Sequence, residues 1–466
     1  MEIKHTFFDI RRGLLLLLTI ACTASQVMAQ STGTLSTYSR FGLGLRNDEA
    51  LEWQRSMGGA GVAMPSVNRL NNLNPASYAF IDSLTFILDA GMTAGFGNMR
   101  QDGKACNVKG VTLDYVVAGF RLRRNLGLSF GFKPYSTVNY SFTSFTKENY
   151  REMSDDGLVN TGSAYTGSGG INKVFAGVGW RPFGHLSIGM HAGVLWGSTT
   201  NALGQGYTVN GTESSDYDGF NFYHTADFKS YLLDWGVQYA TPITRQDWLT
   251  VGATVGLGHS LTGDAKLYRY LDNSTYIYAV DSTHNAYDIP MTYSLGLSWQ
   301  HKNNLVVAAD FHYDAWSRCH VPTIQSTGIA LFYPSMQGMY KDNIRLNAGV
   351  EWIPDMISSR FYNRVRYRAG INWSSAYQYT KSKFSDDYST VTGSALGPWE
   401  MNVNLGFGLP LTNGINYRAG IISQVNVGLG WLHRESPSAD MVTENYFMLN
   451  IGVQFNERWF KKYKIQ

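Results

Sequence analysis

Apolar and polar residues alternate along most of this 466-residue chain. Between Leu186 and Trp196 every second residue is apolar, and the residues in between are mainly small or polar. The segment from Val174 to Trp180 has the same pattern, and a short break at 181–185 separates the two. Alternation on both sides of a tight turn predicts a β-hairpin with one apolar face. The longer segment has about the length that a tilted strand needs to cross a bilayer, roughly 9–11 residues.

Fourteen such segments follow one another from residue 84 onward. They span 86–92, 116–122, 126–132, 174–180, 186–196, 231–239, 249–257, 291–299, 305–313, 344–352, 365–373, 401–409, 425–431 and 447–455. An even number of antiparallel strands is typical of single-chain bacterial outer-membrane barrels. The sequence therefore predicts an all-β fold, an antiparallel transmembrane β-barrel of about fourteen strands.

The connections between the segments alternate in length. Short ones are expected at 123–125, 181–185, 301–304 and 410–413, and long ones near 97–110, 140–170, 201–219, 263–289, 317–342 and 378–397. Short turns of outer-membrane barrels face the periplasm and long loops face outward. The aromatic residues then form two girdles: Trp180, Tyr239, Trp299, Trp352 and Phe455 beside short turns, and Trp196, Tyr313, Trp373 and Trp431 beside long loops. We expect aromatic residues of the long loops, for example within 217–223 and 331–333, to catch hydrophobic ligands.

The start of the chain has the pattern of a secretory signal peptide. Basic residues between positions 4 and 12 precede a short apolar run at 13–21, and a small-residue cleavage pattern ends at Ala29. This predicts export with cleavage after Ala29, because the apolar run is too short for a membrane-spanning helix. Lipoprotein processing at Cys22 is the less favoured alternative, because the preceding residues fit a lipobox poorly.

Composition agrees with a membrane barrel. Only 16% of the residues are charged and the formal net charge is +3, so a nucleic-acid partner is not expected. After the signal peptide no run of about 18 apolar residues occurs, which excludes helical membrane spans. A secreted soluble β-sandwich or propeller is the alternative, and the concerted strand register argues against it.

Residues 30–83 do not alternate. Glycines cluster at Gly58, Gly59 and Gly61, and the sequence Asn74-Pro75-Ala76 follows, which together favour compact turns. The segment also contains many apolar residues, so we expect a packed plug inside the barrel and not a flexible periplasmic leader. The predicted organisation is a signal peptide at 1–29, a hatch or plug at 30–83, a barrel at 84–456 and a short periplasmic tail at 457–466.

The inward-facing positions of the strands hold the charged residues. They include Asp89, Arg121, Lys133, Lys173, His191, Asp234, Asp310, His312, Arg345, Glu351, Arg366 and Arg368. Polar interiors are the rule in such barrels, so we interpret most of these residues as packing and hydrating the lumen.

Enzymatic chemistry finds no support in the sequence. His259 and Ser260 are adjacent, so their side chains lie on opposite faces of a strand, and no nucleophile elbow, zinc-protease or phosphate-loop motif occurs. His191 and His312 have no third ligand at metal spacing. We therefore expect no catalytic residues, no metal and no cofactor. Cys106 and Cys319 are expected in surface loops, and the sequence leaves open whether they form a disulfide.

The glycine cluster followed by Asn74-Pro75-Ala76, ahead of fourteen strands, resembles the FadL-like family of long-chain fatty-acid transporters in Gram-negative outer membranes. The resemblance spans the whole mature chain. It implies an N-terminal hatch inside a fourteen-stranded barrel and passive uptake of hydrophobic small molecules through a lateral opening in the wall. The implied partners are membrane lipids and a hydrophobic ligand, and the implied barrel is monomeric. An accessory role in type IX protein secretion and a structural or adhesive barrel are the alternatives.

Pro134 lies at the point where the third predicted strand continues toward its long loop. Proline cannot donate to the β ladder, so a missing hydrogen bond, a bulge or a kink is expected there. The resemblance implies that this kink opens a lateral exit. A harmless bulge near the rim of the barrel is the alternative, because bulges are common at barrel rims.

Overall fold

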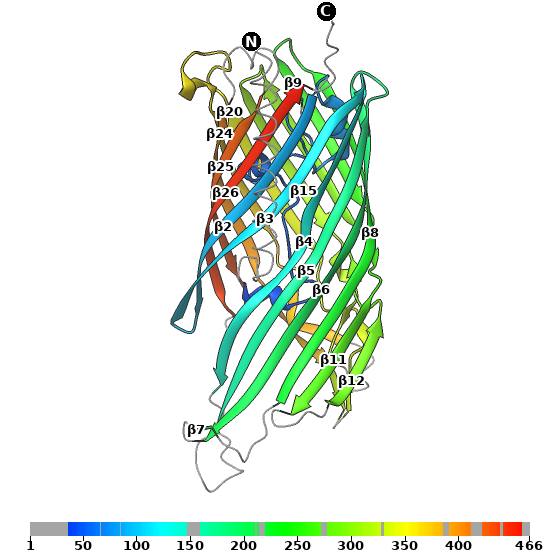
Figure 1. The fold of residues 1–466 in the computed structure, drawn as a ribbon, viewed down its shortest axis with the longest axis vertical. Coiled ribbons are helices and arrows are strands. Elements are labelled where there is room, and N and C mark those ends of the chain that lie inside the picture. The colour runs from blue at the N-terminus through cyan, green and yellow to red at the C-terminus, as the bar shows by residue number, and fades with distance from the viewer. Residues whose placement is uncertain are drawn as a thin grey trace, which may run out of the picture.

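The chain folds into a closed antiparallel β-barrel, seen in a computed structural model that describes residues 36–65, 67–83, 85–146, 159–209, 212–213, 220–271, 277–327, 330–384, 391–411, 422–438 and 441–458. Strand β2 pairs with both β3 and β26, and this pairing closes the wall (Figure 1). The fourteen strands of the wall are β2 (Thr85–Gln101), β3 (Lys104–Arg123), β4 (Leu126–Thr146), β5 (Val159–Trp180), β6 (Leu186–Val209), β8 (Phe220–Pro242), β9 (Asp247–Gly256), β14 (Thr292–His301), β15 (Leu305–Asp314), β20 (Asn343–Trp352), β21 (Arg366–Ser374), β24 (Trp399–Pro410), β25 (Gln424–Glu435) and β26 (Thr443–Arg458). The predicted strand number is confirmed, and every predicted segment lies in a strand of the wall to within one residue at its ends.

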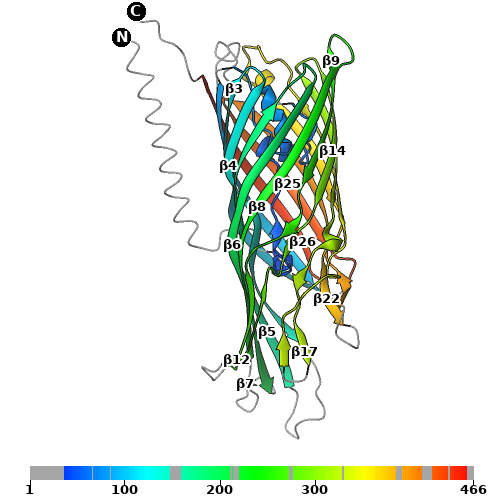
Figure 2. The ribbon, with the colours of Figure 1, turned by 90° about the vertical axis from the view of Figure 1, so that its right-hand side faces the viewer.

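The wall extends far beyond the membrane on the side with the long connections (Figures 1 and 2). Strands β4, β5, β6 and β8 have 21 to 24 residues, about twice what a tilted membrane strand needs. Two further strands, β11 (Asp264–Leu271) and β12 (Ile277–His284), continue the sheet from β8. Much of the chain expected in long loops is therefore strand.

The connection near 97–110 illustrates the difference. Strands β2 and β3 pair up to Gln101 and Lys104, and only Asp102 and Gly103 make the turn. Both turn residues have positive φ, 49° and 74°, as a two-residue hairpin turn requires. Periodicity weakens in such an extension because neither face meets lipid, and for that reason the strand is not evident in the sequence.

Shorter elements fold the remaining outer connections. They are β7 (Thr212–Glu213), β10 (His259–Ser260), β13 (Asp288–Ile289), η3 (Trp316–Arg318), β16 (Val321–Pro322), β17 (Gln325–Thr327), β18 (Ala330–Phe332), β19 (Ser335–Met336), β22 (Tyr379–Phe384) and β23 (Val391–Leu396). The 3₁₀ turn η4 (Phe361–Arg364) lies in the short-turn connection between β20 and β21. Several of the outer connections pack into one hydrophobic core with the inner face of the wall, including Leu195, Phe228, Tyr287, Trp316 and Tyr340. The half of the barrel with the long connections is thus filled by folded loops.

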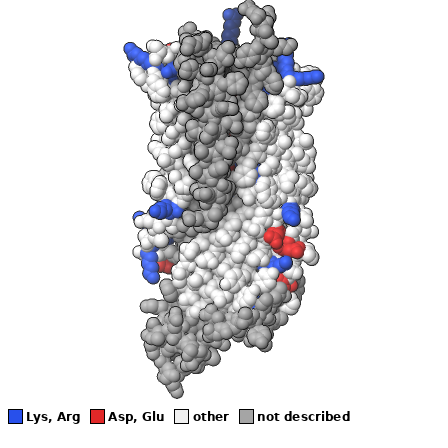
Figure 3. Space-filling view, in the orientation of Figure 1, with Lys and Arg blue, Asp and Glu red and all other residues white. Residues whose placement is uncertain are grey.

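The predicted register of the wall is confirmed. Lipid-facing side chains are exposed, for example Leu295 at 59% and Leu405 at 53%, whereas the charged residues Asp89, Lys133 and Glu351 of the opposite face are buried. Figure 3 shows the consequence, a mostly uncharged band on the described wall between two levels of lysine and arginine. The outward positions meet lipid tails and the inward positions meet protein.

Residues 36–83 lie inside this wall as a plug with little regular structure (Figure 2). Its elements are η1 (Thr37–Arg40), β1 (Leu45–Arg46), α2 (Glu52–Arg55) and η2 (Pro75–Phe80). Trp53, Met57 and Tyr78 of the plug are almost fully buried and share a core with Ile87 and Tyr115 of the wall. The predicted signal peptide at 1–29 and most of the predicted tail at 457–466 lie outside the described residues. In the described part of the chain no helix is long and apolar enough to span a bilayer.

The two cysteines do not pair. Cys106 is exposed in the extension of β3, and Cys319 is buried directly after η3. The expectation that both lie in surface loops was wrong, because β3 extends over Cys106 and the folded outer loops enclose Cys319. Burial, with the negative charges of Asp288 and Asp342, raises the pKa of the Cys319 thiol to about 12.

The cysteines should therefore differ in reactivity toward iodoacetamide at pH 8, because the thiolate is the nucleophile. We expect peptide mass spectrometry of the folded barrel to find Cys106 alkylated within minutes and Cys319 unmodified until the protein is denatured. Equal modification of both residues in the folded barrel would contradict the packing around Cys319.

Candidate functional site: the plug and the break in the wall

The plug contacts the wall backbone to backbone, at inward-facing glycines. A Cβ atom at Gly189 of β6 would lie 2.3 Å from the carbonyl carbon of Pro75, and one at Gly179 of β5 would lie 2.6 Å from its carbonyl oxygen. Further inward-facing glycines approach the plug backbone in the same way: Gly127, Gly252, Gly296, Gly349 and Gly370. Others face side chains of the plug: Gly236, Gly406, Gly428 and Gly452. These glycines follow one another around most of the wall. Any side chain in this ring would push the plug away.

The Asn74-Pro75-Ala76 motif lies against three strands of this ring. The Asn74 side chain accepts from the Ala76 amide at 3.0 Å and so caps η2, while Pro75 takes the first position, where no N–H is needed. The side-chain amide of Asn74 also donates to the carbonyl oxygens of Val62 within the plug and of Val237 in β8, at 2.8 and 3.1 Å. Asn74 thus joins two segments of the plug to the wall.

The glycine cluster forms the second attachment. Gly58 and Gly59 have φ of 69° and 80°, a conformation that only glycine adopts at low cost. Gly58 lies against the backbone of β20 and β21, where a Cβ would be 2.4 Å from the carbonyl oxygen of Ile371. The amide of Gly61 and its neighbour Val62 donate to one carboxylate oxygen of Asp310 in β15, at 2.6 and 2.9 Å.

Ion pairs attach the plug at further points. Glu351 of β20, only 2% exposed, accepts from Arg69 of the plug at 2.6 Å and from Arg366 and Arg368 of β21 at 3.0 and 2.7 Å. The Arg69 guanidinium also lies 3.8 Å from the centre of a Trp53 ring. Three arginines around one buried carboxylate hold this side of the plug by charge as well as by packing.

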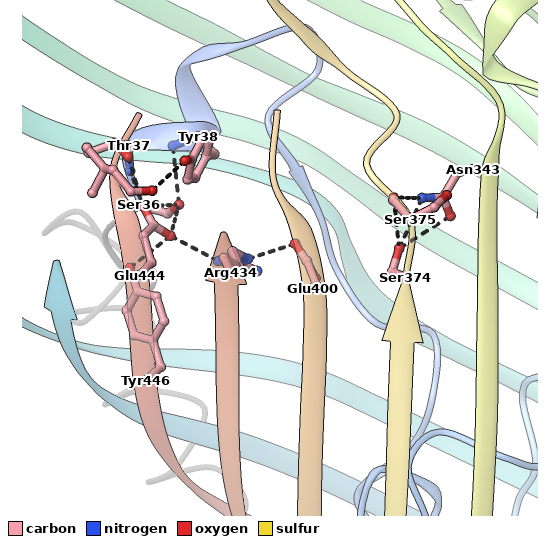
Figure 4. A network of polar contacts seen from close by, with 11 residues as sticks. Ser36, Thr37, Tyr38, Asn343, Ser374, Ser375, Glu400, Arg434, Glu444 and Tyr446 are labelled. Carbon is pink, nitrogen blue, oxygen red and sulfur yellow. Dashed lines mark hydrogen bonds and ion pairs between the residues drawn. The ribbon is translucent and has the colours of Figure 1, made fainter. Parts of the chain in front are cut away.

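Two more attachments lie on β4, β5 and near the long-loop end. Lys173 of β5 pairs with Glu49 of the plug at 2.7 Å, and Lys133 of β4 lies 3.6 Å from the same carboxylate. Figure 4 shows the other network, in which the buried Glu444 of β26 accepts from Ser36 and Thr37 and also faces Arg434 of β25. The same view shows Arg434 bonded to Glu400 of β24, and a separate group of Asn343, Ser374 and Ser375.

The wall has a break between β3 and β4. The two strands pair from Arg123 and Leu126 as far as Val116 and Phe132, and no further pair between them is formed in the described residues. The outer part of β3 pairs only with β2, whereas β4 remains paired with β5 up to Thr146. A bulge after Pro134 shifts the register with β5, and a bulge at Asp114 of β3 shifts the register with β2. Both strands bend where they part.

The plug covers the inner side of this break. Strand β1 takes the place of β3 on the free edge of β4, with Leu45 opposite Thr137 and Arg46 opposite Ser136. The Asn47 amide donates to the carbonyl oxygen of Tyr135 at 2.9 Å. On the other side of the break, Arg55 pairs with Asp114 at 2.7 Å. The break is therefore closed from within by residues 45–55, which no sequence signal identifies.

An aromatic cavity of about 320 Å³ lies on the long-loop side of the break, between η1, the extended strands and the outer loops. Tyr140, Tyr287, Tyr333 and Tyr340 contribute to its lining. A smaller cavity shares Tyr340 with it and reaches Tyr135, the bulged residue of β4. Tyr333 comes from the 331–333 segment expected to catch ligands, whereas the first part of the 217–223 segment lies outside the described residues.

Another cavity, farther from the outer loops, is lined by charged residues instead. It lies at the junction of plug and wall and is lined by Arg46, Glu49, Lys173, Asp234 and Arg345, among others. Both histidines expected in the lumen also line it. Nε2 of His191 is 2.7 Å from the Tyr78 hydroxyl, and Nδ1 of His312 is 2.7 Å from the Ser294 hydroxyl. Neither histidine is near a metal-ligand set in the described part of the chain.

The pair His259 and Ser260 makes no nucleophile. His259 is 2.7 Å from Ser230 and stacks on Tyr231, whereas Ser260 donates to Asp288. The two side chains point to different partners, as their positions on one strand require.

A family model described as BamG matches residues 10–466. The chain belongs to the BamG family. No curated protein matches it. Among solved structures, the fold of this BamG-family chain is similar to the CymD monoaromatic hydrocarbon channel, with 13% identity, a TM-score of 0.55 and coverage of 90% of this chain and 100% of that one.

Two other barrels are similar to a comparable degree. The toluene transporter TbuX of Ralstonia pickettii has 14% identity and a TM-score of 0.52, with 88% of this chain and 99% of that one covered. A FadL homologue of Pseudomonas aeruginosa has 12% identity and a TM-score of 0.55, with 89% and 99% covered. The resemblance to FadL-like transporters therefore holds at the level of the fold, while the family of this chain is BamG.

Replacing Gly189 by alanine should displace the plug, because its Cβ would overlap the Pro75 backbone. We expect limited proteolysis of the folded variant to cut within 36–83, which the intact barrel should resist. Gly184 in the adjoining turn is the matched control, since a Cβ there meets nothing within 4 Å. Equal protection of both variants would contradict the backbone contact.

Replacing Glu351 by glutamine should destabilise the barrel by roughly 3–5 kcal/mol, because three buried guanidinium groups lose their counter-charge. Urea unfolding in detergent micelles measures this change. Glu435 provides the control, since its side chain is 51% exposed and, among the described residues, its ion pair is with His433 alone. We expect Glu435→Gln to stay within about 0.5 kcal/mol, and a Glu351→Gln effect of the same size would contradict the anchoring role.

Proposed function

We propose that this BamG-family barrel lets hydrophobic small molecules enter the outer membrane, passing from the aromatic cavity through the break between β3 and β4 into the bilayer. The break carries this proposal, because a closed barrel has no free strand edge unless its wall is interrupted. Fatty acids and monoaromatic compounds are the substrate classes that we infer. The similar folds of hydrocarbon channels support the class.

The order of the cavities supports a route that leaves the lumen early. The aromatic cavity shares Tyr340 with the small cavity that reaches the bulge at Tyr135. Farther inside, a hydrophobic molecule would meet the charged cavity around Glu49 and Arg345, where it would desolvate ionised groups. The lateral route avoids this cost.

In this proposal the plug stays in place and only its edge moves. Strand β1 must release the edge of β4 to open the break, at the cost of two paired residues and of the hydrogen bond from the Asn47 backbone amide to Tyr135. The anchors at Glu351 and Asp310 lie on the other side of the plug and need not change. Gly58, Gly59, Gly61 and Asn74-Pro75-Ala76 then act as fixed attachments of a hatch, and Pro134 as the kink. The barrel works as a monomer in the outer membrane, without a cofactor.

A structural barrel without transport is the second candidate. Two observations favour it: the hydrophobic core of the outer connections fills the outer half of the lumen, and ion pairs fix the plug to the wall. An accessory role in type IX secretion has no such observation in its favour. Transport measurements on one substitution separate the two candidates.

Replacing Pro134 by valine should supply the missing N–H, favour a continuous ladder and slow the passage of a hydrophobic substrate. Uptake of oleic acid and of toluene into barrel-containing vesicles should fall roughly tenfold, the effect of about 1.4 kcal/mol on the opening equilibrium. The heat-modifiable gel mobility of the folded barrel should not change.

Pro182 in the turn between β5 and β6 is the control, and Pro182→Val should transport at the normal rate. Absence of transport by the unsubstituted barrel would favour the structural candidate. Transport that is unaffected by Pro134→Val would instead exclude the exit at this position.

Replacing Tyr333 by alanine should weaken toluene binding by roughly tenfold, because the buried ring lines the aromatic cavity. Isothermal titration calorimetry of the purified barrel measures the affinity. The neighbouring Phe332 is 48% exposed and is not among the lining residues, so Phe332→Ala should bind normally. Equal losses in both variants would mean that the cavity is not the binding site.

A further inference from the structure

Four arginines crowd one point of the short-turn end of the barrel. Arg121 and Arg123 lie at the end of β3, Arg124 lies in the turn that follows, and Arg181 follows β5. The Arg181 amide donates to the carbonyl oxygen of Asn125 at 2.9 Å, so the two turns touch. The pKa of Arg181 is lowered by burial and by the positive charges of Arg121 and Arg124.

These guanidinium groups have no carboxylate partner in the described part of the chain. Arg121 donates to the carbonyl oxygens of Ile81, Arg123 and Arg124, and Arg181 lies 5.0 Å from the ring centre of Phe80. The nearest acidic residue along the plug, Asp82, bonds to its own neighbour Ser83. The cluster therefore carries a positive charge that has no ion-pair partner among the residues that the structure describes.

A groove on the lipid-facing wall starts beside this cluster. It has a volume of about 480 Å³ and is lined by Trp180, Ile188, Met190, Trp235 and Val237, with Gly189 and Gly236 between them. The lining is almost entirely apolar. Trp180 is the last residue of β5 and directly precedes Arg181, so the groove and the arginine cluster meet at this residue.

We propose that the groove and the cluster together bind one anionic phospholipid of the periplasmic leaflet, with the phosphate at Arg123, Arg124 and Arg181 and an acyl chain along Trp180 and Ile188. Basic pockets at the membrane interface bind anionic headgroups in this way, and tryptophan is favoured at the same level. The site lies on the outer face of the barrel and is independent of the proposed transport route.

The test uses the full-length barrel exchanged into micelles that contain equal amounts of phosphatidylglycerol and phosphatidylcholine. Native mass spectrometry then measures the lipids that remain bound. We expect one preferentially retained phosphatidylglycerol. The variant R123Q/R124Q/R181Q should lower its affinity by roughly a hundredfold, as expected for the loss of about 1 kcal/mol at each of the three arginines.

The matched control R245Q/K302Q/R360Q removes three positive charges from other turns at the same end and should retain phosphatidylglycerol normally. If the triple cluster variant fails to fold, the exposed single variant R124Q should show a smaller loss in the same direction. Equal retention of the two lipids, or equal losses in the cluster and control variants, would overturn the proposal.

The groove is tested separately. Ile188→Trp fills it and should lower phosphatidylglycerol retention, whereas Leu295→Trp at another lipid-facing position should not. Glycerol 3-phosphate has the phosphate without acyl chains and should bind far more weakly than the lipid. Binding of glycerol 3-phosphate as tight as that of the lipid would overturn the lipid assignment. Displacement of the lipid by poly-glutamate at equal charge would also overturn it, and would indicate an acidic protein as the partner.

Discussion

The close approach of the plug backbone to the backbone of the wall strands determines this structure. The plug can lie directly on the inner wall only because the strands present glycine there, as Gly189 does to Pro75 and Gly370 to Met57. At these distances the carbonyl and amide groups of the plug come within reach of wall residues such as Asp310 and Gln238. A buried segment with little regular structure needs such partners, because unpaired buried backbone groups are costly.

The charges of the lumen follow from the same contact. The plug shares a hydrophobic core with the wall, and carboxylates and guanidinium groups add specific attachments to it. Glu351 binds the plug to β20 and β21, while Glu49 extends from the plug to β4 and β5. The attachments surround the plug, and at the break main-chain pairing by β1 adds to the ion pair of Arg55 with Asp114.

The wall could be predicted from sequence because lipid imposes a strict period of two. Positions such as Leu295 and Leu405 must be apolar, and the count of fourteen strands followed from that rule alone. The extension of β2 and β3 beyond residues 97 and 110 was not predicted, because neither face of it meets lipid and so nothing imposes a period of two there. The charged lumen was predicted as a class, but pairs such as Arg69 with Glu351 join residues 282 positions apart, and nothing in the sequence connects them.

The site was predictable only in part. Proline indicated where β4 is irregular, since its missing N–H is a local property of the residue. That β3 departs at this point, and that Leu45 and Arg46 pair with the free edge, depends on the three-dimensional course of three segments. In the sequence, the glycines of the wall could be recognised only as small residues on the inward, polar face of the strands. Their role requires the position of the plug, which no periodicity gives.

The central claim is that the plug stays attached while the wall opens at the break. Hydrogen–deuterium exchange of the full-length barrel, with and without oleic acid, tests it most directly. We predict that the amides of Gly61 and Val62 stay as protected as those of the wall strands in both states, and that only the amides of residues 45–47 and 135–139 exchange faster with oleic acid. Concerted exchange of the whole plug before the wall would contradict the account, because it would mean that the plug leaves the barrel as one unit.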